Sequence, residues 1–208
     1  MNVNARGKST VKLHYSPTSP YVRKVMVVAH EKGLVDQIET ARNSPWDDNE
    51  LSKDNPIRKI PTLVTDDGMA LFDSRVICEY LDDLGNGDAL FPMGGERWSV
   101  LRKAAMGEGI LDAGVSISIE GRRNKEHWSD WHVDRQKEKI NQTLDALETE
   151  AAGLNGPVDI GRITVGCALG YIAFRGFVGD WTKGRPALTA WYEGFSARPS
   201  MKATEHKE

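Results

Sequence analysis

The fold is decided by residues 11–33, which read VKLHYSPTSPYVRKVMVVAHEKG. The opening residues, Val11–Tyr15, predict a short strand. Apolar residues then recur at helical spacing along Pro20–Lys32, which predicts an amphipathic helix that begins with a proline. Ser19 stands in the N-cap position and Gly33 is a suitable terminator. This segment therefore predicts a strand and a helix joined by a loop rich in hydroxyl groups.

The same alternation continues to about residue 85. Gln37–Ala41 is a weakly apolar candidate strand, and Thr62–Thr65 and Met69–Phe72 flank Asp66-Asp67-Gly68, a good hairpin signal. Ser74–Leu84 returns to helical spacing. Its predicted apolar stripe consists of Val76, Ile77, Tyr80, Leu81 and Leu84. This order of elements predicts a small mixed sheet with helices packed on it.

The remainder of the chain differs in pattern. Gly85–Gly95 is rich in turn residues and contains Pro92, so we expect a linker there. Beyond it the periodicity predicts helices at Glu96–Glu120, Asp130–Ala152, Val158–Phe177 and Pro186–Ala197. The third of these is apolar on most faces and is expected to be the buried centre of a helical bundle, capped by Asp159.

Composition and charge restrict the class of protein. The chain has 208 residues, a net charge of −3 and 27% charged residues, which fits a soluble protein with a sizeable core. Its Lys and Arg residues are not gathered in one tract, so we expect no nucleic-acid partner. The apolar run Val25–Ala29 is too short to span a bilayer, and Met1–Thr10 lacks the apolar core of a secretory signal. We therefore expect a cytoplasmic protein with no membrane partner.

The cysteines and histidines offer little chemistry. Cys78 and Cys167 lie in apolar helical patterns without a C-x-x-C spacing, so we expect both to be reduced core residues. The five histidines lack the spacing of a metal site, and no phosphate-binding glycine loop is present. We expect no metal.

The loop after the first strand is the first candidate site. Its hydroxyls belong to Ser16, Thr18 and Ser19. A helix N-terminus carries partial positive charge, so a thiolate that accepts a hydrogen bond from a hydroxyl there would have a lowered pKa. The alternative is that Ser19 only caps the helix.

Two further segments could hold a ligand. Ile60-Pro61 is either an ordinary trans bond that opens an edge strand or a cis bond that leaves the Ile60 backbone facing a ligand. Asp73-Ser74 begins a helix, where Asp73 is expected to be the N-cap. Its carboxylate could also accept from an ammonium group, and the helix N-terminus could bind a carboxylate. Together the three segments could hold a small peptide thiol.

The order and separation of these segments resemble the glutathione transferase superfamily, in its bacterial-type, serine-dependent form. The matched motifs are the strand, loop and helix of residues 11–33, then Asn55-Pro56-x-x-Lys59-Ile60-Pro61-Thr62-Leu63, then Phe72-Asp73-Ser74-Arg75-x-Ile77-x-x-Tyr80-Leu81, and the closing Ala197-Arg198-Pro199-Ser200-Met201-Lys202-Ala203. The linker and the all-helical second half are also similar. The resemblance runs from about residue 11 to the end.

The resemblance implies a fold and a set of roles. The fold is an α/β thioredoxin-like, glutathione-binding domain at residues 11–86 followed by an all-α helical bundle domain at residues 94–208. Ser19 is implied as the catalytic hydroxyl beside the sulfur. The implied glutathione-binding residues are Lys59 near the glycyl carboxylate, Ile60 before a cis Pro61 against the cysteinyl backbone, and Asp73 and Ser74 at the γ-glutamyl end.

The implied function is a transferase of alkyl or aryl groups. Glutathione is the co-substrate, and its thiolate attacks a small hydrophobic electrophile in a cytoplasmic, homodimeric enzyme of detoxification. The alternatives are a glutathione- or partner-binding module with little turnover, and a specialised lyase or reductase on the same scaffold.

Several positions leave the details open. The sulfur contact could be Ser16, Thr18, Ser19 or one of the nearby tyrosines, Tyr15 and Tyr21. Arg58 stands where the family commonly has a small glycine. Asp159-Ile160-Gly161-Arg162 replaces the family's Ser/Thr-x-x-Asp capping box, and we interpret it as a swapped capping device.

The wall of the electrophile pocket is expected from residues 108–119 and the neighbouring Arg122 and Arg123. Ile110, Ser116 and Ile119 are its candidates, although helix packing is the stronger expectation for the apolar ones. Core positions are expected for four of the six tryptophans, namely Trp128, Trp131, Trp181 and Trp191.

Overall fold

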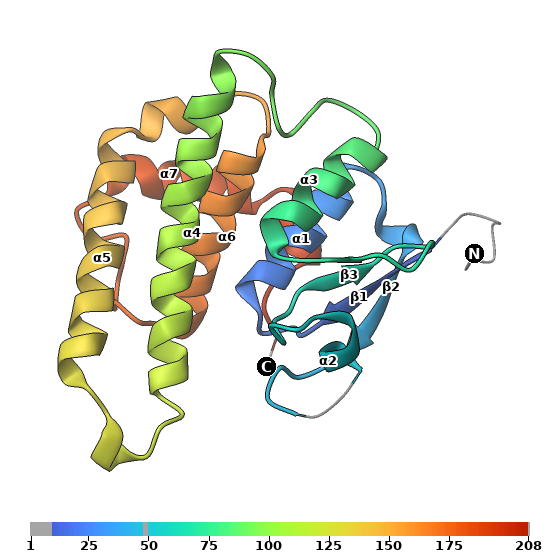
Figure 1. The fold of residues 1–208 in the computed structure, drawn as a ribbon. Coiled ribbons are helices and arrows are strands. Elements are labelled where there is room, and N and C mark those ends of the chain that lie inside the picture. The colour runs from blue at the N-terminus through green and yellow to red at the C-terminus, as the bar shows by residue number, and fades with distance from the viewer. Residues whose placement is uncertain (1–9, 48–49, 208) are drawn as a thin grey trace. The chain divides into compact units, whose positions relative to one another are not determined.

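The computed structural model describes residues 10–47 and 50–207, which form two compact units (Figure 1). One unit runs to Phe91 and includes the C-terminal residues from Ala203 onward. The other unit is Pro92–Lys202. The segment Met1–Thr10, discussed above for its lack of a signal core, lies outside the described residues except for Thr10.

The first unit is built on a four-stranded mixed sheet in the order β2-β1-β3-β4. β1 (Val11–Tyr15) runs parallel to β2 (Ile38–Arg42) and antiparallel to β3 (Thr62–Val64), and β3 pairs antiparallel with β4 (Ala70–Leu71). The predicted mixed sheet is confirmed. The strand predicted at Gln37–Ala41 is β2, displaced by one residue.

Three helices complete this unit, namely α1 (Pro20–Glu31), α2 (Leu51–Asp54) and α3 (Ser74–Leu84). Figure 1 shows α1 and α3 side by side, and they pack against each other. Leu13 of β1 and Val25 of α1 are fully buried, as expected for a core between helices and sheet.

The predicted stripe on α3 is too wide. Ile77 and Leu81 are fully buried, whereas Val76 and Leu84 are each 47% exposed. Residues four apart form one row along a helix, so Ile77 and Leu81 belong to a different row from Val76, Tyr80 and Leu84. Only the first row faces the core of this unit.

The second unit is entirely helical, as predicted. Its helices are α4 (Glu96–Glu120), α5 (Asp130–Thr149), α6 (Ile160–Arg175), α7 (Pro186–Ser196) and most of α8 (Pro199–Ala203). α4 packs on both α5 and α6, and α6 is buried at every residue from Ile160 to Ile172. A Cβ at Gly107 of α4 would lie 2.8 Å from the Thr164 backbone, so a larger residue there would force α4 and α6 apart.

The swapped capping device is confirmed at the start of α6. The Asp159 carboxylate accepts from the Arg162 N–H at 2.8 Å and also pairs with the Arg162 guanidinium. That guanidinium donates in addition to the carbonyls of Leu154 at 2.7 Å and Asn155 at 2.5 Å. The arginine therefore anchors the preceding turn to the helix N-terminus, where the family pattern has an acidic residue.

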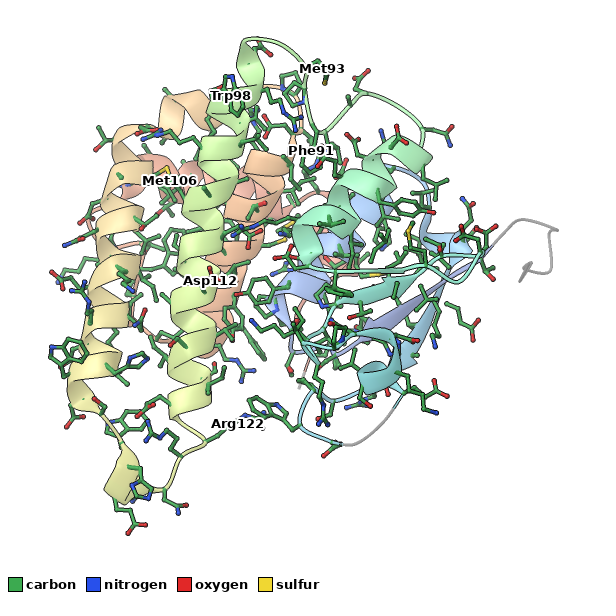
Figure 2. The ribbon with its side chains drawn as sticks, viewed as in Figure 1. Phe91, Met93, Trp98, Met106, Asp112 and Arg122 are labelled. Atoms are coloured by element: carbon green, nitrogen blue, oxygen red, sulfur yellow. The ribbon has the colours of Figure 1, made fainter. Side chains whose placement is uncertain are left out.

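The predicted core role holds for Trp181 but is wrong for two other tryptophans. Trp131 is 73% exposed and Trp128 is 40% exposed, near the start of α5, where Trp128 Nε1 donates to the Asp130 carboxylate at 2.8 Å. Exposed apolar side chains also occur near the start of α4, where Figure 2 labels Met93 and Trp98. An aromatic residue in a helical segment does not by itself say which face it occupies.

The predicted linker contains no helix or strand. Its first half is attached to the first unit, because the Asp82 carboxylate on α3 accepts from the N–H groups of Leu90 and Phe91 at 2.9 and 3.0 Å. Lys32 pairs with the same carboxylate at 3.0 Å and donates to the Asp88 carbonyl at 3.0 Å. Both Lys32 and Asp82 are almost completely buried.

Cys78 and Cys167 are buried and form no disulfide, as predicted. Within residues 10–47 and 50–207, no helix combines the length and apolar character needed to cross a bilayer. The same described residues contain no group of three or more His, Cys, Asp or Glu side chains that could hold a metal ion.

Candidate functional site

The segments predicted to bind a ligand meet at one edge of the sheet. The β1–β3 pairing ends with His14 opposite Thr62, so the hydroxyl loop begins beside Ile60-Pro61. The β3–β4 pairing ends at Leu71, two residues before Asp73. The register therefore brings together three segments that are far apart in the sequence.

Ser19 is the N-cap of α1, as predicted. Its backbone is extended, and its Oγ accepts a hydrogen bond from the Val22 N–H at 3.3 Å. A hydroxyl that accepts can still donate, and no acceptor for the Ser19 proton lies among the described residues. Ser16 Oγ and Thr18 Oγ1 instead bond to each other at 3.2 Å. Ser19 thus caps the helix and keeps its proton for another partner.

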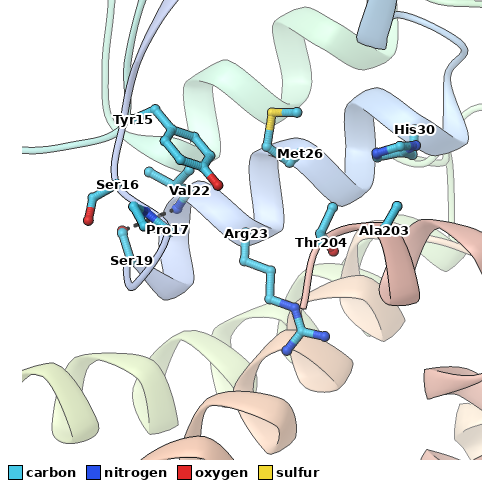
Figure 3. Close-up of a pocket in the computed structure, with 10 residues that line it drawn as sticks. All are labelled: Tyr15, Ser16, Pro17, Ser19, Val22, Arg23, Met26, His30, Ala203 and Thr204. Atoms are coloured by element: carbon cyan, nitrogen blue, oxygen red, sulfur yellow. Dashed lines mark hydrogen bonds between the residues drawn. The ribbon is translucent and has the colours of Figure 1, made fainter. Parts of the chain in front are cut away.

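A pocket lies beside this loop (Figure 3). Its wall includes Tyr15, Ser16 and Ser19, three of the groups that sequence reasoning left open for the sulfur contact. The rest of the wall comes from the adjoining loop, from α1 and from the C-terminal segment, namely Pro17, Val22, Arg23, Met26, His30, Ala203 and Thr204. Lys59, Ile60, Pro61, Asp73 and Ser74 do not line this pocket.

The Ile60–Pro61 peptide bond is cis, as the resemblance implies. Among the described residues, neither the N–H nor the C=O of Ile60 has a hydrogen-bond partner. Lys59 is exposed, so its ammonium group is accessible to solvent. Both the backbone of Ile60 and the side chain of Lys59 can therefore bind an added group.

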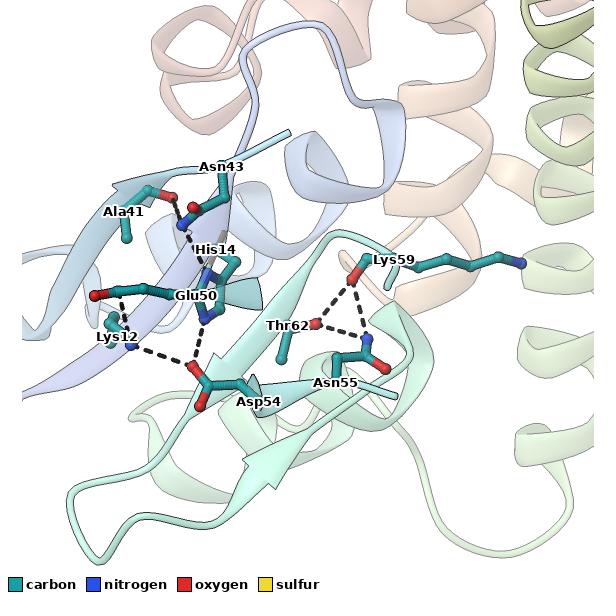
Figure 4. A network of polar contacts seen from close by, with 9 residues as sticks. All are labelled: Lys12, His14, Ala41, Asn43, Glu50, Asp54, Asn55, Lys59 and Thr62. Carbon is teal, nitrogen blue, oxygen red and sulfur yellow. Dashed lines mark hydrogen bonds and ion pairs between the residues drawn. The ribbon is translucent and has the colours of Figure 1, made fainter. Parts of the chain in front are cut away.

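A buried asparagine holds this loop in place (Figure 4). The Asn55 side-chain amide donates to the Lys59 carbonyl at 3.0 Å and to Thr62 Oγ1 at 2.8 Å, and its oxygen accepts from the Ile57 N–H at 3.0 Å. Thr62 Oγ1 also donates to the Lys59 carbonyl at 2.8 Å. A buried amide with all these bonds fixes the backbone of the loop.

Arg58 has a φ of +51°, the only positive φ of a non-glycine residue in the described part of the chain. This left-handed conformation favours glycine, which accounts for the small residue that the family commonly has here. The Arg58 guanidinium donates to the Asp47 carbonyl at 2.8 Å. The loop therefore keeps the shape that a glycine would allow, although the residue differs.

Asp73 caps α3, as predicted. Its carboxylate accepts from the Arg75 N–H at 2.9 Å, and the side chain is exposed. Ser74 is 3% exposed, and its hydroxyl has no hydrogen-bond partner among the described residues. The N-terminus of α3 therefore offers a carboxylate and a hydroxyl next to each other.

Relatives identify the family. The family model for the "Glutathione S-transferase, N-terminal domain" matches residues 18–84, and the model for the "Glutathione S-transferase, C-terminal domain" matches residues 131–194. The GST-like protein YibF of Escherichia coli K12 is 35% identical over 200 residues, which cover 94% of this chain and 98% of YibF. The chain belongs to the glutathione transferase superfamily. The function of YibF itself is described as uncharacterized.

Solved structures of other superfamily members agree. A glutathione transferase family member from Pseudomonas fluorescens Pf-5 with bound glutathione is 42% identical, with a TM-score of 0.91 over 96% of this chain and 100% of that one. That protein has also been solved with bound S-(propanoic acid)-glutathione. A glutathione S-transferase from Methylobacillus flagellatus KT with glutathione bound is 34% identical, with a TM-score of 0.88 over 95% and 100% of the two chains. The predicted fold class, a thioredoxin-like domain followed by a helical domain, is confirmed.

The helical half of this superfamily member gives less definite candidates. Ile110 is fully buried and therefore a core residue, whereas Ile119 is exposed. Ser116 Oγ bonds with His132 Nε2 at 2.8 Å. Arg122 lies just beyond α4, as Figure 2 shows, while Arg123 pairs with Glu120 at 3.2 Å. Ile110, Ser116 and Arg123 therefore serve the packing and polar contacts of their own unit.

Sequence reasoning quoted Asn55 as part of a motif but assigned it no role, and it missed His14. The signal for Asn55 was its place directly before Pro56 in a segment that must turn. The signal for His14 was an imidazole within an otherwise strand-forming segment that becomes the interior strand β1. Buried polar groups need partners, so such a residue predicts a polar network.

Proposed function

We propose that this chain is a glutathione transferase that binds the tripeptide at the sheet edge and ionises its thiol beside Ser19. One observation carries the proposal. Among the described residues, the Ser19 hydroxyl at the N-terminus of α1 has no acceptor for its proton, and it lies at the same edge of the sheet as the Ile60 backbone, which has no hydrogen-bond partner. The glutathione bound to the Pseudomonas fluorescens and Methylobacillus flagellatus relatives supports the choice of ligand.

The Ser19 hydroxyl would donate to the sulfur and thereby favour the thiolate. Hydrogen bonding to the charged form lowers a pKa, and so does the partial positive charge of a helix N-terminus. A free thiol has a pKa of about 8.5, and a decrease of about two units would leave most of it ionised at neutral pH. Capping through the Oγ lone pair and donation through the proton are compatible, because they use different parts of one hydroxyl.

The rest of the tripeptide would be held by groups with matching chemistry. The N–H and C=O of Ile60, before the cis Pro61, would pair with the cysteinyl backbone. Asp73 would accept from the γ-glutamyl ammonium while Ser74 donates to its carboxylate. The exposed Lys59 ammonium would reach the glycyl carboxylate.

The thiolate would attack an electrophilic carbon of a small hydrophobic substrate. A carbon–sulfur bond forms, and in an alkyl or aryl halide the carbon–halogen bond breaks and halide leaves with the electron pair. The S-(propanoic acid)-glutathione in the Pseudomonas fluorescens relative is a thioether of this kind. Detoxification of electrophiles in the cytoplasm is the role that fits this chemistry.

We infer that the enzyme is a homodimer. Val76 and Leu84 lie in one row on α3 and are each 47% exposed. Apolar side chains gathered on one face are typical of a surface that another subunit covers. Sedimentation of the full chain tests this directly: a monomer at micromolar concentration would contradict it.

Calorimetric titration with glutathione, followed by turnover measurements, tests the proposed function. We expect glutathione binding and conjugation with a panel of aryl and alkyl halides, and much slower conjugation by Ser19→Ala at neutral pH. Binding without turnover across the whole panel would favour a binding module on the same fold. Absence of binding would refute the proposal.

A further inference from the structure

His14 is a fully buried imidazole with a partner on each ring nitrogen (Figure 4). Its Nε2 lies 2.7 Å from Asp54 Oδ2, and its Nδ1 lies 2.8 Å from Asn43 Nδ2. The Asn43 amide nitrogen also donates to the Ala41 carbonyl at 3.4 Å, so it is the donor toward Nδ1. Nε2 must therefore carry the ring proton and donate it to Asp54.

These bonds connect β1 with segments on both sides of it. The Asn43 N–H donates to the Tyr15 carbonyl at 3.1 Å, at the point where β1 leads into the hydroxyl loop. On the other side, the Asp54 carboxylate also pairs with Lys12 Nζ at 3.2 Å. Partial burial raises the pKa of Asp54, but the hydrogen bonds from His14 and Lys12 and the positive charge of Lys12 outweigh it, and the net pKa is lowered. Asp54 is therefore an ionised acceptor for His14 at neutral pH.

Asp54 connects His14 to the loop before the cis proline. It is the last residue of α2, and Asn55 follows it directly. The Asn55 amide then holds the Lys59 carbonyl and Thr62 Oγ1, as described above. An unbroken series of hydrogen bonds and covalent bonds thus runs from His14 on β1 to the backbone that precedes Ile60.

The residue at this position could have been apolar if packing were its only task. β1 is an interior strand of the sheet, and its neighbour Leu13 is fully buried without any polar contact to satisfy. A buried imidazole loses its hydrogen bonds with water and needs others in their place. An aliphatic side chain has no such bonds to replace. The cost is offset here by bonds that tie β1 to two other segments.

We propose that His14 is a positioning residue for the glutathione site: through Asp54 it sets the place of the loop that carries Lys59 and Ile60 relative to the hydroxyl loop that follows β1. The inference rests on the proposed function. Two loops that bind opposite parts of one ligand must be held at a fixed separation, and small displacements of such groups cost affinity. His14 itself lies outside the predicted contacts with glutathione.

Two amide substitutions separate the roles of the ring nitrogens. The amide of asparagine reaches about as far as Nδ1, so His14→Asn keeps the bond with Asn43 and loses the bond with Asp54. The longer glutamine places its amide near Nε2, so His14→Gln keeps the bond with Asp54. The two variants have side chains of the same polarity, but only His14→Asn interrupts the connection through Asp54 to the loop of Lys59 and Ile60.

Glutathione affinity by calorimetry, turnover at saturating glutathione and thermal unfolding are measured for both variants and for the unaltered protein. We expect His14→Asn to weaken glutathione binding about tenfold, the lower end of the loss that follows removal of residues that orient the ligands of metal sites. His14→Gln should remain within about threefold of the unaltered affinity, since it keeps a donor toward Asp54. kcat should change little in either variant, because Ser19 is untouched and the loss is in binding.

Asp54→Ala supplies a second test that substitutes no residue of β1. It should weaken glutathione binding as His14→Asn does, and combining the two should weaken it no further, because both interrupt one connection. Equal affinities of folded His14→Asn, folded His14→Gln and the unaltered protein would overturn the positioning role and leave the proposed function intact. Equal losses of affinity in both His14 variants, in step with their melting temperatures, would reduce the residue to a structural one and also overturn the inference. If the unaltered protein bound no glutathione, the proposed function would fail, and the positioning role with it.

Discussion

Replacement of Ser19 by alanine should raise the thiol pKa of bound glutathione. The hydroxyl proton has no acceptor among the described residues, so a thiolate beside it would receive a full hydrogen bond. A hydrogen bond to a charged group contributes about 1.5–3 kcal/mol, and about 1.4 kcal/mol corresponds to one pKa unit. The alanine variant should therefore show a thiol pKa about one to two units higher than the unaltered enzyme.

The rate follows from the ionised fraction. If the pKa of the bound thiol moves from below neutrality to above it, kcat at neutral pH should fall about tenfold or more. The loss should shrink as the pH rises, because alkaline solution ionises the thiol without help from Ser19. A pH profile displaced toward alkaline values is thus the expected signature.

Loss of the helix cap is a separate effect and needs its own control. Substitution of an N-cap serine by alanine costs about 1 kcal/mol of stability, whereas glycine costs only a few tenths. Ser19→Gly removes the hydroxyl with little loss of capping, and Ser19→Thr retains both functions. The glycine variant should therefore match alanine in thiol pKa and remain closer to the unaltered protein in unfolding temperature.

Ultraviolet absorbance of the thiolate, followed by pH titration of each complex, measures the pKa directly. The reasoning is refuted if Ser19→Ala and Ser19→Gly bind glutathione with the same thiol pKa as the unaltered protein. In that case Tyr15 or Ser16, which line the adjacent pocket, would become the preferred donor.

Three further results are expected. Asp73→Ala should weaken glutathione binding and lower stability by about 0.5–2 kcal/mol through the lost cap of α3; unchanged calorimetric titrations of the folded variant would remove Asp73 from the site. Asp82→Ala should cost about 3–5 kcal/mol in denaturant unfolding, because it leaves Lys32 buried without its carboxylate. The ion pair of Arg102 with Glu150 is exposed to solvent, so Arg102→Ala should lower the free energy of unfolding far less. Asp54 has a lowered pKa in the folded state, so its stabilising effect is present above the usual carboxyl range and is lost as the pH falls through the lowered pKa. In Asp54→Asn the free energy of unfolding should therefore fall less steeply as the pH is lowered. The same acid dependence in the variant and the unaltered protein would contradict this.

Local signals in the sequence were sufficient for most elements. The boundaries of α1 follow from Ser19, from the proline after it and from Gly33, whose φ of +68° is the left-handed conformation expected beyond a helix end. α4 begins and ends where predicted, at Glu96 and Glu120. Caps and periodicity depend on residues within one or two turns, so a single sequence contains the information.

Burial was less predictable because it depends on what covers each face. The row of Val76 and Leu84 on α3 has the same periodicity as a core stripe, yet it is half exposed in this chain. The same holds for Trp131. Its position in α5 follows from the sequence, but its exposure to solvent does not. Periodicity identifies an apolar face, and only the packing of other elements decides whether that face is covered.

The positioning of the site was the hardest part to predict, since it rests on contacts between distant residues. His14 meets Asn43 and Asp54 across separations of 29 and 40 residues, and neither pairing has a local pattern. The sequence nevertheless contained one physical clue, an imidazole in the strand directly before the hydroxyl loop. Because His14 is fully buried, its imidazole required polar partners, and these come from the residue after β2 and the last residue of α2. The residues most exposed to solvent at the site, such as Lys59, were predicted from the motif, whereas the buried ones that hold them required the register of the sheet.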